Sequence, residues 1–299
     1  MSADRGVSRT LTLPWTLLAL LAVACDDDGL QQIPEPDAGF PVDAADPEDA
    51  GFPDAVVRDF GVRPDLGFPD VQPASEPIYI HTATELYTYD AELNVAASVG
   101  TFRSAAGPLE AGMVDIAIGL DGRMYGGDRA GEGQNGSGIN NVWIIDSNSG
   151  FCTRVFEIDD YPHGLTVLAD GRLVVAGDRI SVIDPNTGNV ELELDSQYET
   201  SGDIVGLPDG YLYWTVRPAN QGEGDGLVRI DVNTGQFVHL GQVEVTRLFG
   251  LGFTQGALYG FSSGGQVVKI DPGNARVIEQ LTLTGSWWGA TTNPVRWED

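Results

Sequence analysis

One short pattern occurs five times in the last three quarters of this 299-residue chain, and its fifth copy is divided between the two ends of that region. Each copy holds a strand rich in small residues, an Asp-Gly-type turn, a strand of the form x-[Leu/Met]-[Tyr/Val], and a strand ending in Ile-Asp before an Asn-Thr-Gly-type turn. Repeats of this length are typical of folds that use one supersecondary unit several times. The repeat therefore constrains the fold more than any other feature.

Two series of turns punctuate the copies. The turn that follows each third strand begins at Asp90, Asp146, Asp184, Asp231 and Asp271. An Asp carboxylate can accept the amides of its own turn, so we expect these five residues to be structural. The turn that closes each first hairpin is Asp121-Gly122, Asp170-Gly171, Asp209-Gly210 or Gln255-Gly256, and such pairs predict a tight type I′ turn.

The strands before the second turn series are rich in Gly and Ala, although Gly weakens a strand interior. Small residues are what strands need where they converge on the axis of a β-propeller. The first copy starts at Pro77-Ile78 with its second strand, and the chain ends with an inner-type strand at Trp288–Pro294. We therefore predict an all-β fold over residues 77–299: one β-propeller of five four-stranded blades, closed by the C-terminal strand joining the N-terminal blade. An open repeat array is the alternative.

The N-terminal residues predict where in the cell the protein is located. Residues 1–24 read as a signal peptide, with Arg5 and Arg9 before an apolar run that is too short for a membrane span. Residues 21–25, Leu-Ala-Val-Ala-Cys, resemble a bacterial lipobox, which implies cleavage before Cys25, lipidation of Cys25 and anchoring in a membrane. An ordinary secretory signal, with Cys25 nearby by chance, is the alternative.

Residues 25–76 predict a disordered tether. Positions 26–76 hold 14 acidic and 2 basic residues together with frequent Pro, and such a segment cannot bury enough apolar surface to fold. Extended, it could hold the propeller on the order of 100 Å from the membrane. An acidic tether behind a lipobox is similar to those of surface lipoproteins of myxobacteria and their relatives. We therefore expect a location in the cell envelope, periplasmic or on the cell surface, with the outer membrane favoured.

The net charge and the absence of known motifs limit the classes of function that we expect. The formal net charge of −28 repels phosphate backbones and excludes nucleic acid as an expected partner. Only Cys25 and Cys152 are present, without zinc-site spacing, and the chain contains no G-x-S-x-G, Walker or H-E-x-x-H motif. Cys152 is expected to be a small buried residue of an outer strand.

Two insertions mark one face of the predicted propeller. They are Asp128–Asn140 and Arg217–Gly226, and both connect the second and third strands of their blades. Loops on a rigid scaffold commonly carry binding residues, although flexible loops without a role are the alternative. The candidate ligand-binding residues in these loops are Asn135, Asn140, Arg217, Glu223 and Asp225.

The mouth of the predicted channel supplies the other candidates, which are Asp115, His163, Asp203, Arg247, Trp287 and Trp288. Asp115, His163 and Asp203 form a candidate metal set, for Ca²⁺ or for a transition metal. In the alternative interpretation the two Asp residues accept backbone amides, His163 is a hydrogen-bonded loop residue, and the Trp residues fill the core.

The units of the form Leu-Tyr-Gly…Val-x-x-Ile-Asp-Pro-x-Thr-Gly, clearest at 170–188, 209–235 and 258–274, resemble the broad YVTN/NHL/SMP-30-like class of bacterial propellers. This class includes binders, scaffolds and enzymes, so the resemblance implies architecture more than activity. The residues favour a non-enzymatic binding or scaffold module for a protein or carbohydrate partner. The alternative is a metal-dependent hydrolase or lyase with Asp115, His163 and Asp203 as ligands or base.

Overall fold

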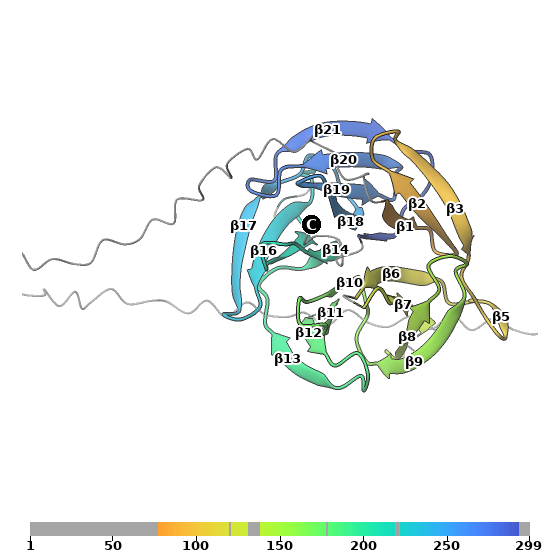
Figure 1. Cartoon of the computed structure of the whole chain (residues 1–299). Helices are drawn as coiled ribbons and strands as arrows, with labels where there is room; N and C mark the ends of the chain where they lie inside the picture. The colour runs from red at the N-terminus through yellow and green to blue at the C-terminus, as the bar shows by residue number, and fades with distance from the viewer. Residues whose placement is uncertain are drawn as a thin grey trace, which may run out of the picture. The chain divides into compact units, whose positions relative to one another are not determined.

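Five antiparallel sheets of four strands each surround a common centre (Figure 1). The computed structural model describes residues 77–119, 121–130, 138–177, 179–218, 220 and 222–292. The predicted five-bladed β-propeller is therefore confirmed. The signal peptide and tether predicted for residues 1–76 lie outside the described residues.

Each blade runs outward from an inner strand. Blade 1 consists of β22 (Gly289–Thr291), β1 (Ile78–His81), β2 (Glu85–Asp90) and β3 (Val95–Thr101). Blade 2 consists of β6 (Met113–Ile118), β7 (Met124–Asp128), β8 (Asn140–Ile145) and β9 (Cys152–Ile158). Blade 3 consists of β10 (Gly164–Val167), β11 (Leu173–Ala176), β12 (Ile180–Ile183) and β13 (Val190–Leu194).

The remaining blades follow the same plan. Blade 4 consists of β14 (Thr200–Gly206), β15 (Leu212–Val216), β16 (Gly226–Asp231) and β17 (Gln236–Gln242). Blade 5 consists of β18 (Leu248–Thr254), β19 (Ala257–Ser262), β20 (Gln266–Ile270) and β21 (Val277–Thr282). Since the same connection order recurs, all second-to-third-strand connections leave on one face of the ring.

The C-terminal strand closes the ring as predicted. β22 pairs antiparallel with β1, and Gly289 lies opposite His81 while Thr291 lies opposite Tyr79. The amide of Trp288 donates to the carbonyl of His81 and extends the pairing by one bond. Closure gives blade 1 four strands that come from both ends of the repeat region, and β22 covers the inner edge of β1.

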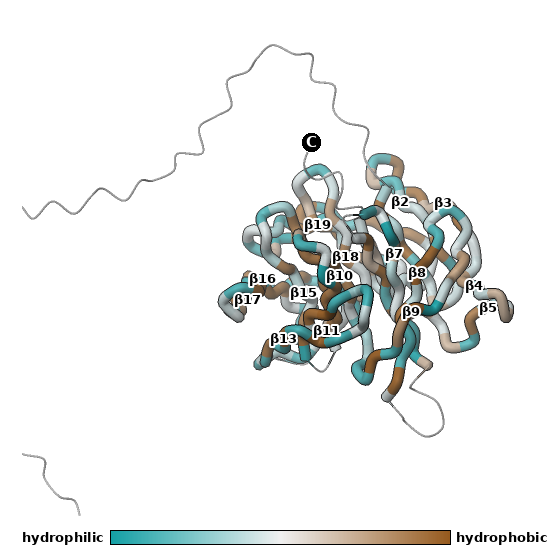
Figure 2. Tube along the Cα trace, turned by 60° about the horizontal axis from the view of Figure 1, so that its bottom comes forward, coloured by the Kyte–Doolittle hydropathy of each residue, from teal (hydrophilic) through white to brown (hydrophobic). Residues whose placement is uncertain are grey.

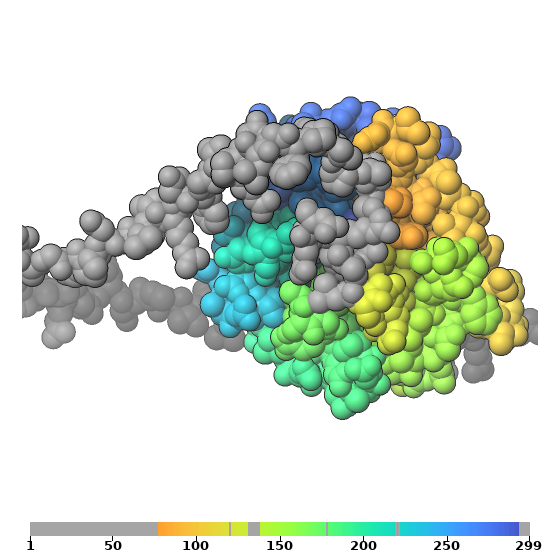
Figure 3. Space-filling view, viewed as in Figure 1, coloured from red at the N-terminus to blue at the C-terminus, as the bar shows by residue number. Residues whose placement is uncertain are grey.

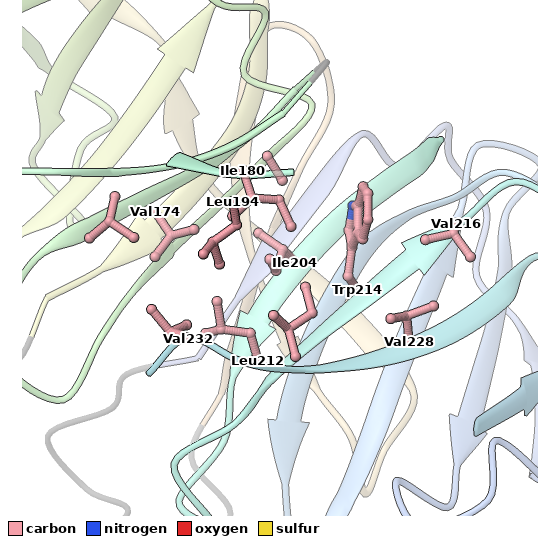
Figure 4. Packing of buried hydrophobic residues seen from close by; sticks show 12 residues of the cluster. Val174, Ile180, Leu194, Ile204, Leu212, Trp214, Val216, Val228 and Val232 are labelled. Atoms are coloured by element: carbon pink, nitrogen blue, oxygen red, sulfur yellow. The ribbon is translucent and has the colours of Figure 1, made fainter. Parts of the chain in front are cut away.

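The hydrophobic core lies between blades. Figure 4 shows the junction of blades 3 and 4, where Val174 and Ile180 face Leu212 and the ring of Trp214. Middle strands are buried on both faces, as in β11, where all four residues are buried. Removing the Trp214 ring would cost about 3–5 kcal/mol. In Figure 2 hydrophobic segments follow the strands and hydrophilic segments concentrate in the loops.

The turns that follow the third strands match the sequence prediction. In each copy the Asp Oδ1 accepts the amide two residues later, for example from Asn186 to Asp184 at 2.9 Å. The residue that ends the turn has positive φ, as at Gly188 (75°). These bonds hold the pKa of Asp184 below its ordinary value, which fits a structural acceptor.

The predicted type I′ conformation is wrong for the Asp-Gly turns. At Asp209-Gly210 only the Gly has positive φ (84°), the amide of Gly210 donates to Leu207, and the amide of Leu207 donates to Tyr211. This is a three-residue loop, a type I turn closed by a Gly in the left-handed region. Pro208 explains the choice, because its fixed φ suits the second position of a type I turn. Gln255-Gly256, with both φ values positive, has the predicted conformation.

A small hairpin lies between blades 1 and 2 and was not predicted. It is formed by β4 (Arg103–Ser104) and β5 (Gly107–Pro108), and it projects from the rim in Figures 1 and 3. Arg103 pairs with Phe151 in an isolated bridge and places its guanidinium over that ring at 5.6 Å. Within the described part of the chain no helix is long and apolar enough to cross a membrane.

Candidate functional site

Two blades carry long connections on the same face. The second and third strands are joined by three residues in blades 1, 3 and 5 (82–84, 177–179 and 263–265). Blade 2 uses eleven (129–139) and blade 4 uses nine (217–225). The two inserted loops were therefore placed on the correct connections. Asn135 lies outside the described residues, as does Cys25.

The blade 4 insertion packs on its own blade and on the start of blade 5. Glu223 accepts bonds from the side-chain amides of Asn220 (3.0 Å) and Gln242 (2.6 Å). The buried Asp225 carboxylate accepts the amide of Leu248 at 2.8 Å, and burial raises the pKa of Asp225. Glu223 thus faces the surface with side-chain partners, whereas Asp225 supports the backbone.

A pocket of about 580 Å³ opens beside this insertion. Its walls come from the connection before β14, the start of the insertion and the outer strand β17. The lining residues are Gln197, Tyr198, Glu199, Val216, Arg217, Pro218, His239 and Gln242. Tyr198 and His239 lie with their rings nearly parallel, at 22° and 6.2 Å between centroids. Arg217 pairs with Glu199 at 3.3 Å across the wall.

Two other hollows fit a ligand less well. One of about 260 Å³ lies between blades 2 and 3 near Ile158 and Val175, and one of about 310 Å³ lies on the opposite face near Arg123 and Asp170. Small-molecule sites usually hold about 300–1,000 Å³. The blade 4 pocket is the larger space and adjoins an inserted loop, so it is the better candidate.

The centre of the ring holds Asp115 and Asp203, both fully buried. Asp115 on β6 accepts the amide of Leu165 from blade 3 at 2.5 Å. Asp203 on β14 accepts amides from Leu251 in blade 5 (2.5 Å) and Ala290 in blade 1 (3.4 Å). The two carboxylates therefore connect the inner strands of all five blades. This matches the alternative interpretation of both residues as acceptors of backbone amides.

His81 is the residue that the sequence interpretation missed. It is buried at the end of β1, its Nδ1–H donates to the Thr82 carbonyl, and its Nε2 lies 3.9 Å from Asp115 Oδ1. Neither of these facing atoms has a hydrogen-bond partner within the described part of the chain. They meet where Gly289 has no side chain, because a Cβ there would overlap both atoms.

Protonation at the centre follows from burial. Burial raises the pKa of Asp203 to about 8 and, with the charge of Asp203, raises the pKa of Asp115 well above its ordinary value. Burial lowers the pKa of His81 to about 4, partly opposed by its bond to Thr82. At neutral pH the carboxyl pair holds at least one proton and His81 is neutral.

The proposed metal set is not assembled. The ring of His163 lies against that of Tyr161, tilted by 46° with centroids 4.3 Å apart, and the histidine at 3.9 Å from Asp115 is His81. His163 was interpreted as the channel histidine, and this stays a prediction, whereas pairing of β22 with β1 brings His81, which was not predicted, to Asp115. Among the described residues no group of three or more His, Cys, Asp and Glu side chains is arranged to hold a metal ion.

The remaining candidates have structural contacts. Trp287 is buried between blades 5 and 1, edge-on to Tyr87, and its indole N–H donates to Leu283. Trp288 is half-buried beneath the guanidinium of Arg129 at 5.0 Å. Arg247 has φ of 58° and precedes β18, and the side chain of Asn140 donates to the Asp160 carbonyl at 2.8 Å.

The pocket residues outside the insertion were not predicted from the sequence. Gln197, Tyr198, His239 and Gln242 lie on two segments that carry no shared motif. A usable signal was the position of Tyr198 and Glu199 immediately before the inner strand of the blade that carries an insertion.

The known proteins that this chain resembles are distant from it. No protein-family model matches the chain, and no curated protein matches it. Among solved structures, one described as U3-55K has a TM-score of 0.43 and 11% identity over 69% of this chain and 61% of its own, so this chain spans about three fifths of that protein. TolB from Acinetobacter baumannii has a TM-score of 0.42 and 15% identity, over 72% and 55% of the two chains. Glutaminyl cyclase from Myxococcus xanthus has a TM-score of 0.41 and 15% identity, over 60% and 70%.

Proposed function

We propose that this chain is a lipid-anchored binding protein of the bacterial cell envelope, whose propeller presents its loop face to a protein or carbohydrate outside the cytoplasm. The observation that carries the binding role is the coincidence of three features on one face: two long connections and the pocket beside one of them. The lipobox-like residues before Cys25 and the acidic segment 25–76 support the anchor and its reach.

The catalytic alternative has less support. Asp115 and Asp203 are fully buried and accept backbone amides, and the ring of His163 lies against that of Tyr161. A catalytic acid or base has to reach its substrate, whereas these carboxylates hold neighbouring strands together.

The anchor is tested by metabolic labelling of the full chain with radioactive palmitate in a Gram-negative host. We expect label on the wild type and none on Cys25→Ser, with the label recovered in the membrane fraction. An unlabelled wild type, or equal labelling of both, would remove the lipid anchor from the proposal.

The binding face is tested on arrays of envelope polysaccharides and envelope proteins. We expect the wild type to bind a component, a variant with 217–225 shortened to three residues to lose it, and Arg123→Ala on the opposite face to keep it. The three residues kept are Arg217, Gly224 and Asp225, so the connection has the length found in blades 1, 3 and 5 and the buried Asp225 carboxylate remains for the Leu248 amide. Binding that survives shortening, or the absence of any binding by the wild type, would overturn the assignment.

A further inference from the structure

The blade 4 pocket combines an aromatic platform with planar polar side chains. Tyr198 packs against the core cluster between blades 3 and 4, and its ring centroid lies 6.4 Å from that of Phe237. These core contacts fix the position of the Tyr198 ring. His239 lies nearly parallel to it and is exposed. Aromatic rings that are apolar on the face and wet at the edge are effective surfaces for ligands with both characters.

The polar groups surround that platform. Gln197, Glu199, Arg217 and Gln242 each carry a planar group with two or more hydrogen-bonding atoms. Glu223 holds the amide nitrogen of Gln242 at 2.6 Å and thereby orients this side chain at the rim. Such groups can bind two neighbouring hydroxyls at once, which is how a site distinguishes a hydroxylated ligand from one that lacks the hydroxyls.

The charge and polarity of the pocket argue against an anionic ligand and against a lipid. Arg217 is the single Lys or Arg among the lining residues and is paired with Glu199 at 3.3 Å. With Glu223 also at the rim, an anionic ligand would meet net negative charge. A lipid would find few apolar walls, since Val216 and Pro218 are the aliphatic lining residues.

We propose that the blade 4 pocket is a subsite for a neutral sugar. A pyranose ring would place its C–H face on Tyr198 and His239 and its hydroxyls toward Gln197, Glu199 and Gln242. A pocket of about 580 Å³ has room for one or two sugar units. This assignment rests on the proposed binding function and specifies its ligand class.

The test is calorimetry and saturation-transfer NMR on the full chain with galactose, N-acetylglucosamine, maltose and cellobiose. Galacturonate and tetralysine are the charged comparators. We expect at least one neutral sugar to bind, Tyr198→Ala and Gln242→Ala each to weaken it by about tenfold or more, and Tyr198→Phe to keep it. About tenfold corresponds to 1.4 kcal/mol.

Tyr211→Ala is the matched control, since this half-buried tyrosine belongs to the same blade but lies at the turn before β15, on the opposite face. Its ring is covered by the Arg229 guanidinium at 4.5 Å. We expect this variant to bind the sugar as the wild type does. Equal weakening by Tyr211→Ala and Tyr198→Ala would show a general loss of structure and remove the site.

The outcomes separate this inference from the proposed function. If no neutral sugar binds, yet the full chain still binds an envelope component through 217–225, the sugar assignment is wrong and the binding function stands. If tetralysine binds and sugars do not, the acidic walls select a cationic peptide. If neither the sugars nor the arrays give binding, both proposals fall.

Discussion

The centre of the ring and the rim of blade 4 use the same kinds of side chain in opposite surroundings. At the centre Asp115, Asp203 and His81 are fully buried, and the carboxylates accept backbone amides from neighbouring blades. At the rim Glu199 and Glu223 have side-chain partners at the surface. Removing a buried acceptor leaves a buried amide without a partner, whereas a surface acceptor can exchange its partner for water or for a ligand.

The difference assigns stability to the centre and recognition to the rim. The fold depends on the carboxylates that connect strands, so substituting them should lower the free energy of unfolding. The carboxylates that face the pocket serve the ligand, so substituting them should lower the affinity for the ligand and leave the free energy of unfolding unchanged.

The largest effect is expected for Asp203→Ala. The amides of Leu251, Ile204 and Ala290 would lose their acceptor in a buried site, and each such amide costs about 1–3 kcal/mol, so we expect a loss of about 3–9 kcal/mol. Denaturant unfolding of the full chain, followed by tryptophan fluorescence, measures it. Asp203→Asn, which keeps one acceptor oxygen, should lose less.

The next effect is expected for Gly289→Ala. The added Cβ would overlap Asp115 Oδ1 and His81 Nε2, and overpacking of this kind typically costs about 1–3 kcal/mol. Gly206→Ala is the matched control on another inner strand, because the atom nearest to its added Cβ would lie 3.4 Å away. Equal unfolding free energies for the two variants would mean that the centre is not tightly packed.

How far the sequence could predict these regions depends on the range of the interactions. The turns were predictable because Asp184 and its amide partners lie within three residues of each other. The convergence of Asp115 and Asp203 followed from counting along repeated strands. Their role as amide acceptors was one of two interpretations, and only the neighbouring blades, which supply the amides, decide between them.

The errors and omissions have physical reasons as well. The type I′ prediction failed because Pro208, and Ala169 in blade 3, add a residue to the loop. His81 was missed because its place depends on pairing between the two ends of the chain, at Gly289. The pocket was missed because Tyr198 and His239 lie 41 positions apart and approach each other only after blade 4 has folded.

The pH dependence of stability is a smaller and more specific test. The folded-state pKa of Asp203 is raised to about 8 from 3.8, and that of Asp115 is raised too, so their contribution is fully present below about pH 4 and is lost as the pH rises through 8. The pKa of His81 is lowered from 6.5 to about 4, so its contribution is present above 6.5 and is lost toward pH 4.

We therefore expect the full chain to lose unfolding free energy between about pH 6.5 and 8, where the unfolded carboxyl is ionised, the folded Asp203 still keeps its proton and His81 no longer changes the balance. Asp115→Asn should reduce this loss, because an amide can donate as the protonated acid does without ionising. Urea titrations at steps of half a pH unit measure the slope for both proteins. A slope that is the same in the variant would show that the central pair does not titrate in this window.

The smallest effect on stability is expected at the rim, for Glu199→Gln. Arg217 and Glu199 are largely exposed, at 64% and 79%, and an exposed ion pair loses in side-chain entropy and salt screening much of what it gains in attraction. The unfolding midpoint of the full chain should be unchanged, at low and at high salt alike. Sugar binding should nevertheless weaken, because the substitution replaces one carboxylate acceptor by an amide donor toward the ligand. A variant that unfolds earlier but binds normally would reverse the division between centre and rim, since the rim carboxylate would then serve the fold.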